Sequence, residues 1–300
     1  MIDLQINGFS GVDFNSDELE GEELHRASMA LKNIGVQKFL PTLITAPVDK
    51  MSSRAAKLAL LVEENEDLNR MIPGIHLEGP FISSKDGYRG AHPLSDVRFA
   101  DLEIIKELQG ACAGKLLLFT LAPEQDNRGK VTKFLTDQGV IVSAGHTNAS
   151  TDQLKNAIDS GLQMFTHLGN ACPQQLPRHD NIIQRVLAFS DKLLISYIAD
   201  GLHLPFFVLR NLLQATGYDR SIIVSDAISA AECKSGSYTL GDQSIEIKDD
   251  GVSQSADGSH FIGSTTSLAK MYQNLMNNLG LNKEQADDLT FSNPSRLLGL

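Results

Sequence analysis

Short apolar segments alternate with longer amphipathic segments along most of the chain, beginning at Ile2–Ile6. The short segments have the length and composition of buried strands, whereas the longer ones repeat apolar residues at helical spacing. The predicted strands are Ile2–Ile6, Lys38–Thr42, Met71–His76, Leu116–Thr120, Ile141–Ala144, Met164–Thr166, Leu194–Ile198 and Ile222–Ser225. The predicted helices are Glu22–Ile34, Asp49–Asn65, Ala100–Gln109, Arg128–Gln138, Thr151–Ser160, Asn181–Phe189 and Pro205–Ala215. This alternation predicts parallel strands joined by crossover helices, and eight strands is the number in an α/β (β/α)8 TIM barrel.

The pattern changes after the eighth predicted strand. Ser237–Leu240 and Ser244–Lys248 flank a short polar turn, which predicts a hairpin, and Ser264–Leu279 and Asn282–Leu289 predict closing helices. We therefore expect a single TIM-barrel catalytic domain over residues 1–300 with a β-hairpin insertion near residues 237–248. A doubly wound sheet is the alternative, but no Gly-x-Gly-x-x-Gly follows the first strand.

Composition limits the classes of partner. The 300 residues carry a formal net charge of -11, which argues against nucleic acid and anionic membranes because both need a basic patch. No apolar run is long enough to span a bilayer, and the N-terminus lacks the features of a signal peptide. The three cysteines are widely spaced, so a disulfide framework is not expected. We expect a cytoplasmic protein with no nucleic-acid or membrane partner.

Polar residues stand at or just beyond the ends of four predicted strands, and these residues are Glu78, His146, His167 and Asp226. In a parallel barrel these ends meet at one mouth, where catalytic residues are mounted. Two imidazoles and a carboxylate are a normal ligand set for a catalytic divalent ion, and Asp226 could exchange a proton between water and a leaving group. One histidine at a strand end is more often structural, but four polar residues at equivalent ends favour a metal site with an acid/base.

Three further residues are weaker candidates. His203 follows the seventh predicted strand, and His92 lies in a glycine-rich loop after Glu78. Either could bind an anion or a sugar hydroxyl, or lie at the surface. Arg178 lies in a loop rich in proline and glutamine, where it could be solvated or bind phosphate in a bidentate manner.

Taken together, several segments resemble the N-acetylglucosamine-6-phosphate deacetylases of the amidohydrolase superfamily over almost the whole chain. The segments are Asp3-Leu4-Gln5-Ile6-Asn7-Gly8, Pro41-Thr42-Leu43-Ile44-Thr45, His76-Leu77-Glu78-Gly79-Pro80-Phe81, Ser143-Ala144-Gly145-His146-Thr147-Asn148-Ala149, Thr166-His167-Leu168-Gly169-Asn170-Ala171, Ile198-Ala199-Asp200-Gly201-Leu202-His203 and Val224-Ser225-Asp226-Ala227. The combination is specific, although no single segment would be.

The resemblance implies a metal-dependent TIM barrel that hydrolyses N-acetylglucosamine 6-phosphate to acetate and glucosamine 6-phosphate. It assigns Glu78, His146 and His167 as metal ligands and Asp226 as the general acid/base. The positions that match the family's binding site for a phosphorylated amino sugar are Ala91, His92, Asn170, Ala171, Arg178, His203, Phe261, Ile262 and Gly263. The family's counterpart of Arg178 can serve a neighbouring subunit, which implies a functional homodimer.

Two features depart from relatives of this kind. Many amidohydrolases carry His-x-His after the first strand for a second metal, but this chain has Gln5-Ile6-Asn7. Carboxamides are poor ligands beside imidazole, so we expect one divalent ion, zinc first, with iron, cobalt and manganese as alternatives. Family members also carry a small β-sandwich built from both chain ends, and we expect most of it to be lacking here.

The sequence leaves two alternative functions open. One is deacetylation of a related N-acyl amino sugar such as N-acetylgalactosamine 6-phosphate. The other is a non-catalytic barrel that binds an amino-sugar phosphate, although such a barrel would not need the carboxylate of Asp226.

Overall fold

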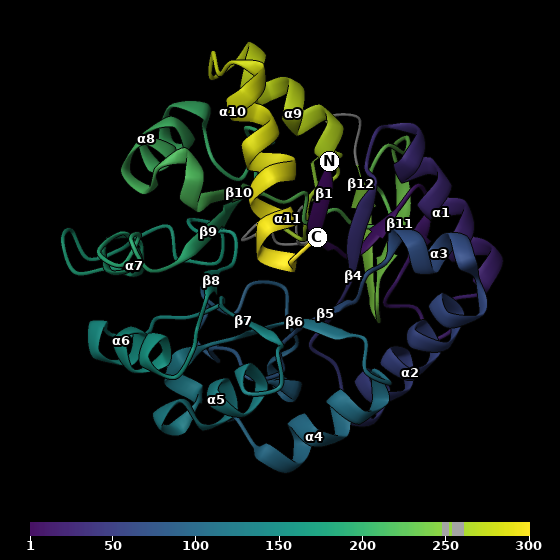
Figure 1. Ribbon diagram of the computed structural model, residues 1–300, viewed down its shortest axis with the longest axis horizontal. Helices are drawn as coiled ribbons and strands as arrows, with labels where there is room; N and C mark the ends of the chain where they lie inside the picture. The colour runs from purple at the N-terminus through teal and green to yellow at the C-terminus, as the bar shows by residue number, and fades with distance from the viewer. Residues whose placement is uncertain (248–251, 254–260) are drawn as a thin grey trace.

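The computed structural model describes residues 1–247, 252–253 and 261–300. Eight parallel strands follow one another around a barrel in chain order, with helices outside them (Figure 1). They are β1 (Ile2–Ile6), β4 (Lys38–Ile44), β5 (Ile75–Glu78), β6 (Leu116–Leu121), β7 (Ile141–Ala144), β8 (Met164–Phe165), β9 (Leu194–Tyr197) and β10 (Ser221–Ile223). The ring closes just beyond β10, where the amide of Asp226 donates to the carbonyl of Gln5 over 3.0 Å and that of Asn7 to the carbonyl of Ala227 over 2.7 Å. The predicted TIM barrel is confirmed.

The helices surround the barrel and bury their apolar faces against it. They are α1 (Gly21–Asn33), α2 (Val48–Glu64), α3 (Glu66–Met71), α4 (Leu102–Ala111), α5 (Lys130–Thr136), α6 (Thr151–Asp159), α7 (Ile182–Leu187), α8 (Phe206–Thr216), α9 (Leu268–Asn277), α10 (Lys283–Asp287) and α11 (Asn293–Leu298). A π-helical turn, Asp288–Ser292, joins the last two. Within the described ranges, no helix is both long and apolar enough to cross a membrane.

The predicted first residue of one strand was wrong. The sequence suggested that Met71–His76 is extended, but Met71 ends α3 and the strand begins only at Ile75. The side chain of Asn65 caps α3 by accepting from the amides of Asp67 and Leu68. Met71 therefore lies on the buried face of a short helix. A brief apolar run does not by itself distinguish such a helix from a strand.

Two small antiparallel pairs lie outside the ring. β2 (Gly8–Phe9) and β3 (Val12–Asp13) pair directly after β1. β11 (Gly236–Leu240) and β12 (Gln243–Ile247) pair where the hairpin is predicted, while its expected last residue, Lys248, lies outside the described residues. The extent of a single domain over residues 1–300 stays a prediction.

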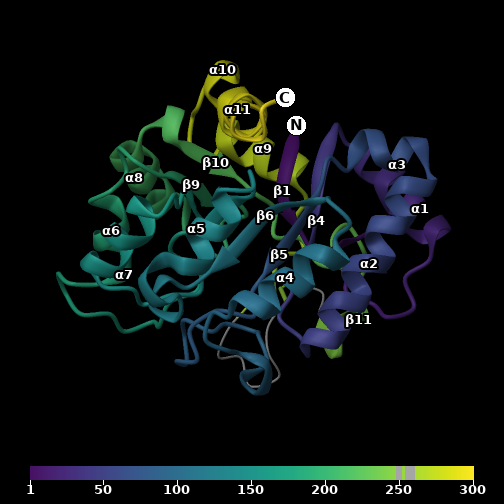
Figure 2. The ribbon, with the colours of Figure 1, turned by 60° about the horizontal axis from the view of Figure 1, so that its bottom comes forward.

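The β11–β12 hairpin is tied to the barrel at two points. The amide of Gly241 donates to Oδ2 of Asp13 over 2.7 Å, and Nε2 of Gln243 donates to the carbonyl of Ala91 over 2.9 Å. The second bond holds the loop that precedes His92. In Figure 2 the two chain termini lie at the top, and the loop after β5 lies toward the bottom of the molecule. The hairpin therefore supports a loop at the mouth.

Candidate active site

Four polar side chains stand at the carboxyl ends of barrel strands, as the sequence predicts. Glu78 is the last residue of β5, while His146, His167 and Asp226 follow β7, β8 and β10. The latter three have positive φ angles of 50°, 34° and 47°, which residues other than glycine rarely adopt. Such strain is retained where the surrounding structure imposes it and commonly marks functional sites.

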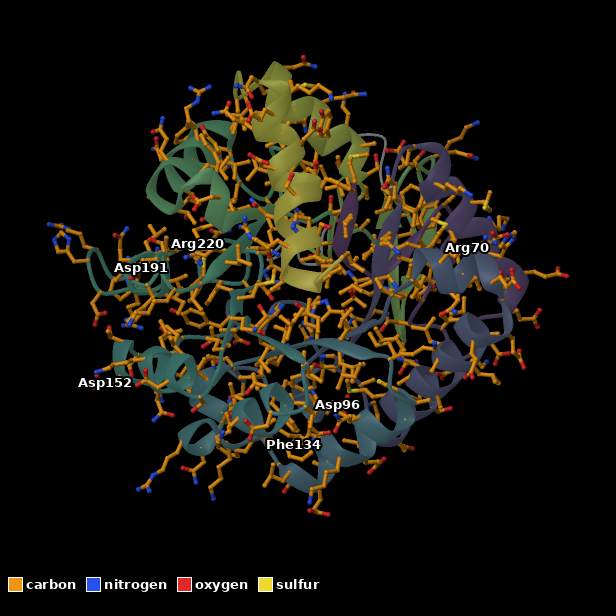
Figure 3. All side chains as sticks on the ribbon, in the orientation of Figure 1. Arg70, Asp96, Phe134, Asp152, Asp191 and Arg220 are labelled. Atoms are coloured by element: carbon orange, nitrogen blue, oxygen red, sulfur yellow. The ribbon has the colours of Figure 1, made fainter. Side chains whose placement is uncertain are left out.

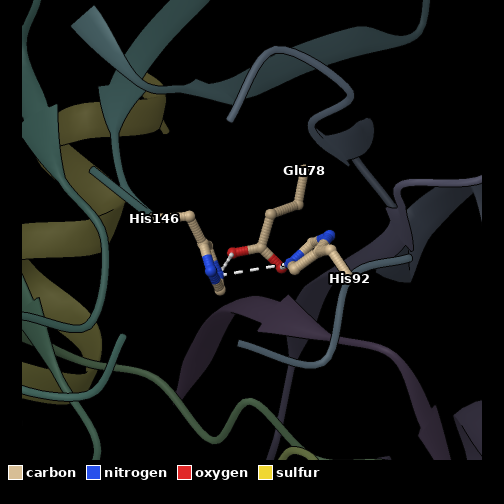
Figure 4. Close-up of side chains that lie close together, drawn as sticks. All are labelled: Glu78, His92 and His146. Carbon is tan, nitrogen blue, oxygen red and sulfur yellow. Dashed lines mark hydrogen bonds and ion pairs between the residues drawn. The ribbon is translucent and has the colours of Figure 1, made fainter. Parts of the chain in front are cut away.

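The carboxylate of Glu78 is at the centre of this group. Its Oε1 lies 3.2 Å from Nε2 of His146 and 3.1 Å from Nε2 of His167. Its Oε2 lies 3.8 Å from Nε2 of His92, which is itself 3.3 Å from Nε2 of His146. Figure 4 shows Glu78, His92 and His146 converging from separate segments.

Glu78, His92 and His146 each offer one ligand atom, and these atoms all lie within 4.8 Å of one another. This trio differs from the predicted set, because it contains His92 in place of His167. His167 contacts the same oxygen of Glu78 as His146, and its ring packs edge-on against that of His146 with centroids 4.9 Å apart. Glu78 and His146 are common to the predicted set and to this trio.

The orientation of His146 suits a metal ligand. Its Nδ1 lies 3.0 Å from the carbonyl of Tyr88 and donates to it, while its Nε2 faces Glu78. Gly90 approaches the same ring, since a Cβ at this position, where φ is +59°, would lie 3.2 Å from Cε1 of His146. A larger residue at position 90 would crowd the imidazole.

Burial and mutual charge shift the pKa values in this group. Burial alone would raise the pKa of Glu78, but His146 and His167 hold it well below its ordinary value. Burial and the neighbouring His146 lower the pKa of His92 to about 3, so this imidazole is neutral at pH 7. Burial would lower the pKa of His167, but the hydrogen bond and charge of Glu78 raise it. A carboxylate surrounded by imidazoles is a donor set that fits a divalent ion.

Asp226 lies beside this cluster and is held by amides from β1 and the residue after it. Nε2 of Gln5 lies 3.0 Å from Oε1 of Glu78 and 3.2 Å from Oδ1 of Asp226, so it bridges the two carboxylates. Burial, together with the charge of Glu78, raises the pKa of Asp226 despite opposing effects of His167 and Asn7. A raised pKa suits a group that must accept a proton near neutral pH.

The sequence pattern presents Gln5 and Asn7 only as residues that replace metal ligands and does not show this hydrogen-bonding role. The signal was present, because alternate residues of an extended segment share one face, and Gln5-Ile6-Asn7 covers the end of the first strand and the residue after it. What the sequence could not supply was the partner across the barrel, Asp226, which is 219 residues from Asn7.

A cavity of about 370 Å³ opens above these groups, within the usual size range of small-molecule sites. Its lining includes Glu78, Ala91, His92, His146, Asn170, Ala171, His203, Asp226, Phe261 and Gly263, all of them predicted site residues. Three other predicted residues are not part of this lining. His167 is buried in contact with Glu78, Ile262 is buried in an apolar cluster, and Arg178 is exposed in the loop after β8.

A parallel eight-stranded barrel with a buried glutamate–histidine cluster and an aspartate at its carboxyl-end mouth defines a protein of the metal-dependent amidohydrolase class. No protein-family model matches the chain. The N-acetylglucosamine-6-phosphate deacetylase of Bos taurus is 31% identical to it over 309 residues, covering 100% of this chain and 73% of that protein. The deacetylase of the same name from Bacillus subtilis (strain 168) is 33% identical over 250 residues, and the match spans 83% of this chain and 62% of that protein's length.

Solved structures agree with these relatives. The N-acetyl-D-glucosamine-6-phosphate deacetylase mutant from Mycobacterium smegmatis, in complex with N-acetyl-D-glucosamine-6-phosphate, matches with a TM-score of 0.90 and 28% identity. That match covers 100% of this chain and 77% of the solved chain. The chain belongs to the N-acetylglucosamine-6-phosphate deacetylase family, as the sequence resemblance indicated.

Proposed function

We propose that this chain hydrolyses the acetamide bond of N-acetylglucosamine 6-phosphate, releasing acetate and glucosamine 6-phosphate. The observation that carries this proposal is the convergence of Glu78, His146 and Asp226 on one cavity at the barrel mouth, in a chain of this family. A metal-binding carboxylate and imidazole beside a separate buried carboxylate are the parts that hydrolysis of an unactivated amide requires.

Glu78, His146 and His167 are the proposed ligands of one divalent ion, with zinc first and iron, cobalt or manganese as alternatives. Such an ion polarises the amide carbonyl and makes water a stronger nucleophile near neutral pH. Support for a single ion comes from Gln5 and Asn7, whose amides are engaged with carboxylates. A second ion would need these positions to offer stronger ligands.

Asp226 is the proposed acid and base. It takes a proton from the attacking water and later gives it to the departing amine nitrogen, which is a poor leaving group unless protonated. His92 lines the cavity beside Glu78 and His146 and is neutral, so we propose that it hydrogen-bonds the carbonyl oxygen as negative charge develops there.

His203, Asn170 and Gly263 line the same cavity, and we propose that they contact the sugar phosphate. Arg178 is exposed and is absent from this lining, so we propose that it binds the phosphate in the site of a second copy of the chain. A homodimer would then be the functional form. The cytoplasmic location also stays a prediction from the sequence.

Acetate release from N-acetylglucosamine 6-phosphate, measured on the same sample as its metal content, tests the proposal. We expect turnover with about one metal ion per chain, loss of turnover after chelation, and its return when zinc or iron is added back. Metal-loaded protein that leaves this substrate intact would contradict the proposal. Faster turnover of N-acetylgalactosamine 6-phosphate would assign the other epimer, and sugar-phosphate binding without hydrolysis would indicate a binding protein.

A further inference from the structure

One wall of the cavity is aliphatic, and it begins beside Glu78. Ile44 ends β4 and pairs in register with Glu78, the last residue of β5. Register partners on parallel strands point to the same face of a sheet. The pair two residues earlier agrees, since Oγ1 of Thr42 lies 3.2 Å from Nδ1 of His76. Ile44 is buried and lines the cavity, so its side chain neighbours the proposed metal-binding carboxylate.

Leu240 extends this wall from the β11–β12 hairpin. It is buried and lines the same cavity, although it is far from Ile44 in the sequence. Among the described residues that line the cavity, Ile44 and Leu240 are the only ones with a branched aliphatic side chain. Both belong to one buried apolar cluster, whose other members are Ile228, Ala230, Ile245, Ile247 and Ile262. The wall is therefore the part of this cluster that reaches the cavity.

The turn that follows Leu240 is fixed to the barrel. The amide of Gly241 donates to Oδ2 of Asp13 over 2.7 Å. Oδ1 of Asp242 accepts from Nη2 of Arg54 over 3.2 Å, and the side chain of Arg54 is itself buried in the barrel wall. A larger group in the cavity would have to push Leu240 against this fixed turn and a packed cluster. Overpacking of this kind is unfavourable, because buried side chains are forced out of their preferred rotamers.

An amide substrate presents two groups of opposite polarity to this cavity. The amide nitrogen carries the sugar phosphate, for which the proposed contacts are polar, and the ring of Phe261 packs 4.7 Å, centroid to centroid, from that of His203 among them. The carbonyl carbon carries the acyl chain, which is apolar and is stabilised by aliphatic contact. The carbonyl must reach Glu78 to be hydrolysed, and Ile44 is the aliphatic neighbour of Glu78.

We propose that Leu240 and Ile44 form the end of the acyl site and restrict the substrate to N-acyl groups about the size of acetyl. Leu240 is then a specificity-determining residue. The inference deepens the proposed function, on which it rests for the class of substrate. A close-packed wall excludes longer chains, because one methylene group in such a pocket changes kcat/KM by about 10- to 200-fold.

The test compares N-acetyl-, N-propionyl- and N-butyryl-glucosamine 6-phosphate on the metal-loaded protein. All three release glucosamine 6-phosphate, so one assay follows them. We expect the wild-type kcat/KM to be about tenfold lower for the propionyl compound and at least about 100-fold lower for the butyryl compound than for the acetyl compound. Leu240→Ala removes the end of the wall, so its butyryl-to-acetyl ratio of kcat/KM should rise at least about tenfold. Ile44→Val is a milder change that should raise the propionyl-to-acetyl ratio about threefold, and it decides the question if Leu240→Ala does not fold.

Ile245→Ala is the matched control. Ile245 is buried in the same cluster and the same hairpin, but it is absent from the described lining of the cavity. This variant reports on general loosening of the hairpin, and we expect wild-type ratios. An equal shift in Leu240→Ala and Ile245→Ala, an unchanged ratio in the folded wall variants, or a wild type that hydrolyses the butyryl compound as well as the acetyl compound would each overturn the inference.

Calorimetric binding to metal-loaded Asp226→Asn separates this inference from the proposed function, because binding is read without turnover. We expect at least about tenfold weaker binding of the butyryl than of the acetyl compound, and a smaller difference when Leu240→Ala is added. Equal affinities for the three compounds would contradict the inference.

The outcomes also keep the two proposals apart. If affinity decreases along the series as expected but the wild type releases no acetate, the proposed function fails and the acyl wall stands. If the wild type releases acetate while Leu240→Ala keeps the wild-type ratio, the function stands and the wall fails. Neither binding nor release with any of the three compounds would overturn both.

Discussion

The side-chain amide of Asn7 donates a 2.8 Å hydrogen bond to Oδ1 of Asp226. Gln5 donates to the same oxygen over 3.2 Å. Among the described residues both amide donors meet Oδ1, which leaves Oδ2 as the oxygen available for proton transfer. Because both amide hydrogen bonds go to one oxygen, the buried carboxylate is held in one orientation. A general base requires such a fixed orientation.

Replacing Asp226 by Asn should therefore abolish turnover without loss of metal or substrate binding. The amide has nearly the same shape but cannot take a proton from water, so we expect kcat to fall about 10³-fold, within the usual range for loss of a general base. Metal content and affinity for N-acetylglucosamine 6-phosphate should change little. Asp219→Asn, at an exposed position, is the matched control and should retain wild-type kcat. Substantial residual turnover in Asp226→Asn would show that another group moves the proton.

The identity of the third ligand can be decided by metal content. His167 is 2% exposed and its Nε2 lies 3.1 Å from Oε1 of Glu78, whereas His92 belongs to the more compact trio around the same carboxylate. We expect His167→Asn to lose most bound metal after dialysis, because three ligands are needed to hold the ion. His92→Asn should keep its metal and lose kcat. Elemental analysis of folded samples makes the comparison, with partly exposed His25→Asn as control. The reverse result would make His92 the ligand.

Arg178 should act on phosphorylated substrate only. We expect Arg178→Ala to raise KM for N-acetylglucosamine 6-phosphate by at least about tenfold, because a guanidinium–phosphate pair is lost, and to leave the weak turnover of free N-acetylglucosamine unchanged. Arg70→Ala is the control, since its side chain is 70% exposed and lies at the edge of the molecule in Figure 3. Equal effects on both substrates would remove Arg178 from the phosphate site.

The proposed dimer makes a second prediction about the same residue. A mixed dimer of one Arg178→Ala chain and one Asp226→Asn chain contains one site with native Asp226 and, across the interface, native Arg178. Co-expression of differently tagged chains should therefore restore acetate release at wild-type KM to the isolated mixed species. If the mixed dimer retains the high KM of Arg178→Ala, the arginine acts within its own chain or not at all.

Most of the fold could be predicted because the barrel repeats a strong local signal. Strand β1 and strand β7 begin and end where the sequence places them, since a buried parallel strand is a short apolar run with clear ends. The strand ends also located Glu78 and Asp226, because the polar residue interrupts an apolar run. Helix α3 was missed because its buried residues, Leu68 and Met71, are too few to show helical spacing.

The rest of the site depends on distances that no local pattern encodes. Asp200 follows a strand that the sequence predicts, but no local pattern shows that it lies 2.6 Å from His203 or that it accepts from the hydroxyl of Ser264, 64 residues away. Gln5 is similar, since its importance lies in bridging Glu78 and Asp226. A sequence indicates which residues lie at the mouth of a barrel. Which of them form hydrogen bonds with one another depends on how the closed barrel brings distant strands together.

Asp3 provides a prediction about stability and pH. This carboxyl is fully buried inside the barrel, accepts from the amide of Ser225 over 3.1 Å through Oδ1, and has no partner for Oδ2 in the described part of the chain. Burial raises the pKa of Asp3 from 3.8 to about 7. The unfolded chain therefore releases this proton near pH 4 while the folded chain keeps it until about pH 7, so the wild type loses stability across that window.

Asn at this position has no charge to bury, and the free energy of unfolding of Asp3→Asn relative to wild type should increase from pH 4 to pH 8 by roughly 4 kcal/mol. Urea unfolding at both pH values measures the difference, with exposed Asp191→Asn expected to show none. A relative stability that stays constant with pH would mean that Asp3 ionises as readily in the folded barrel as in the unfolded chain.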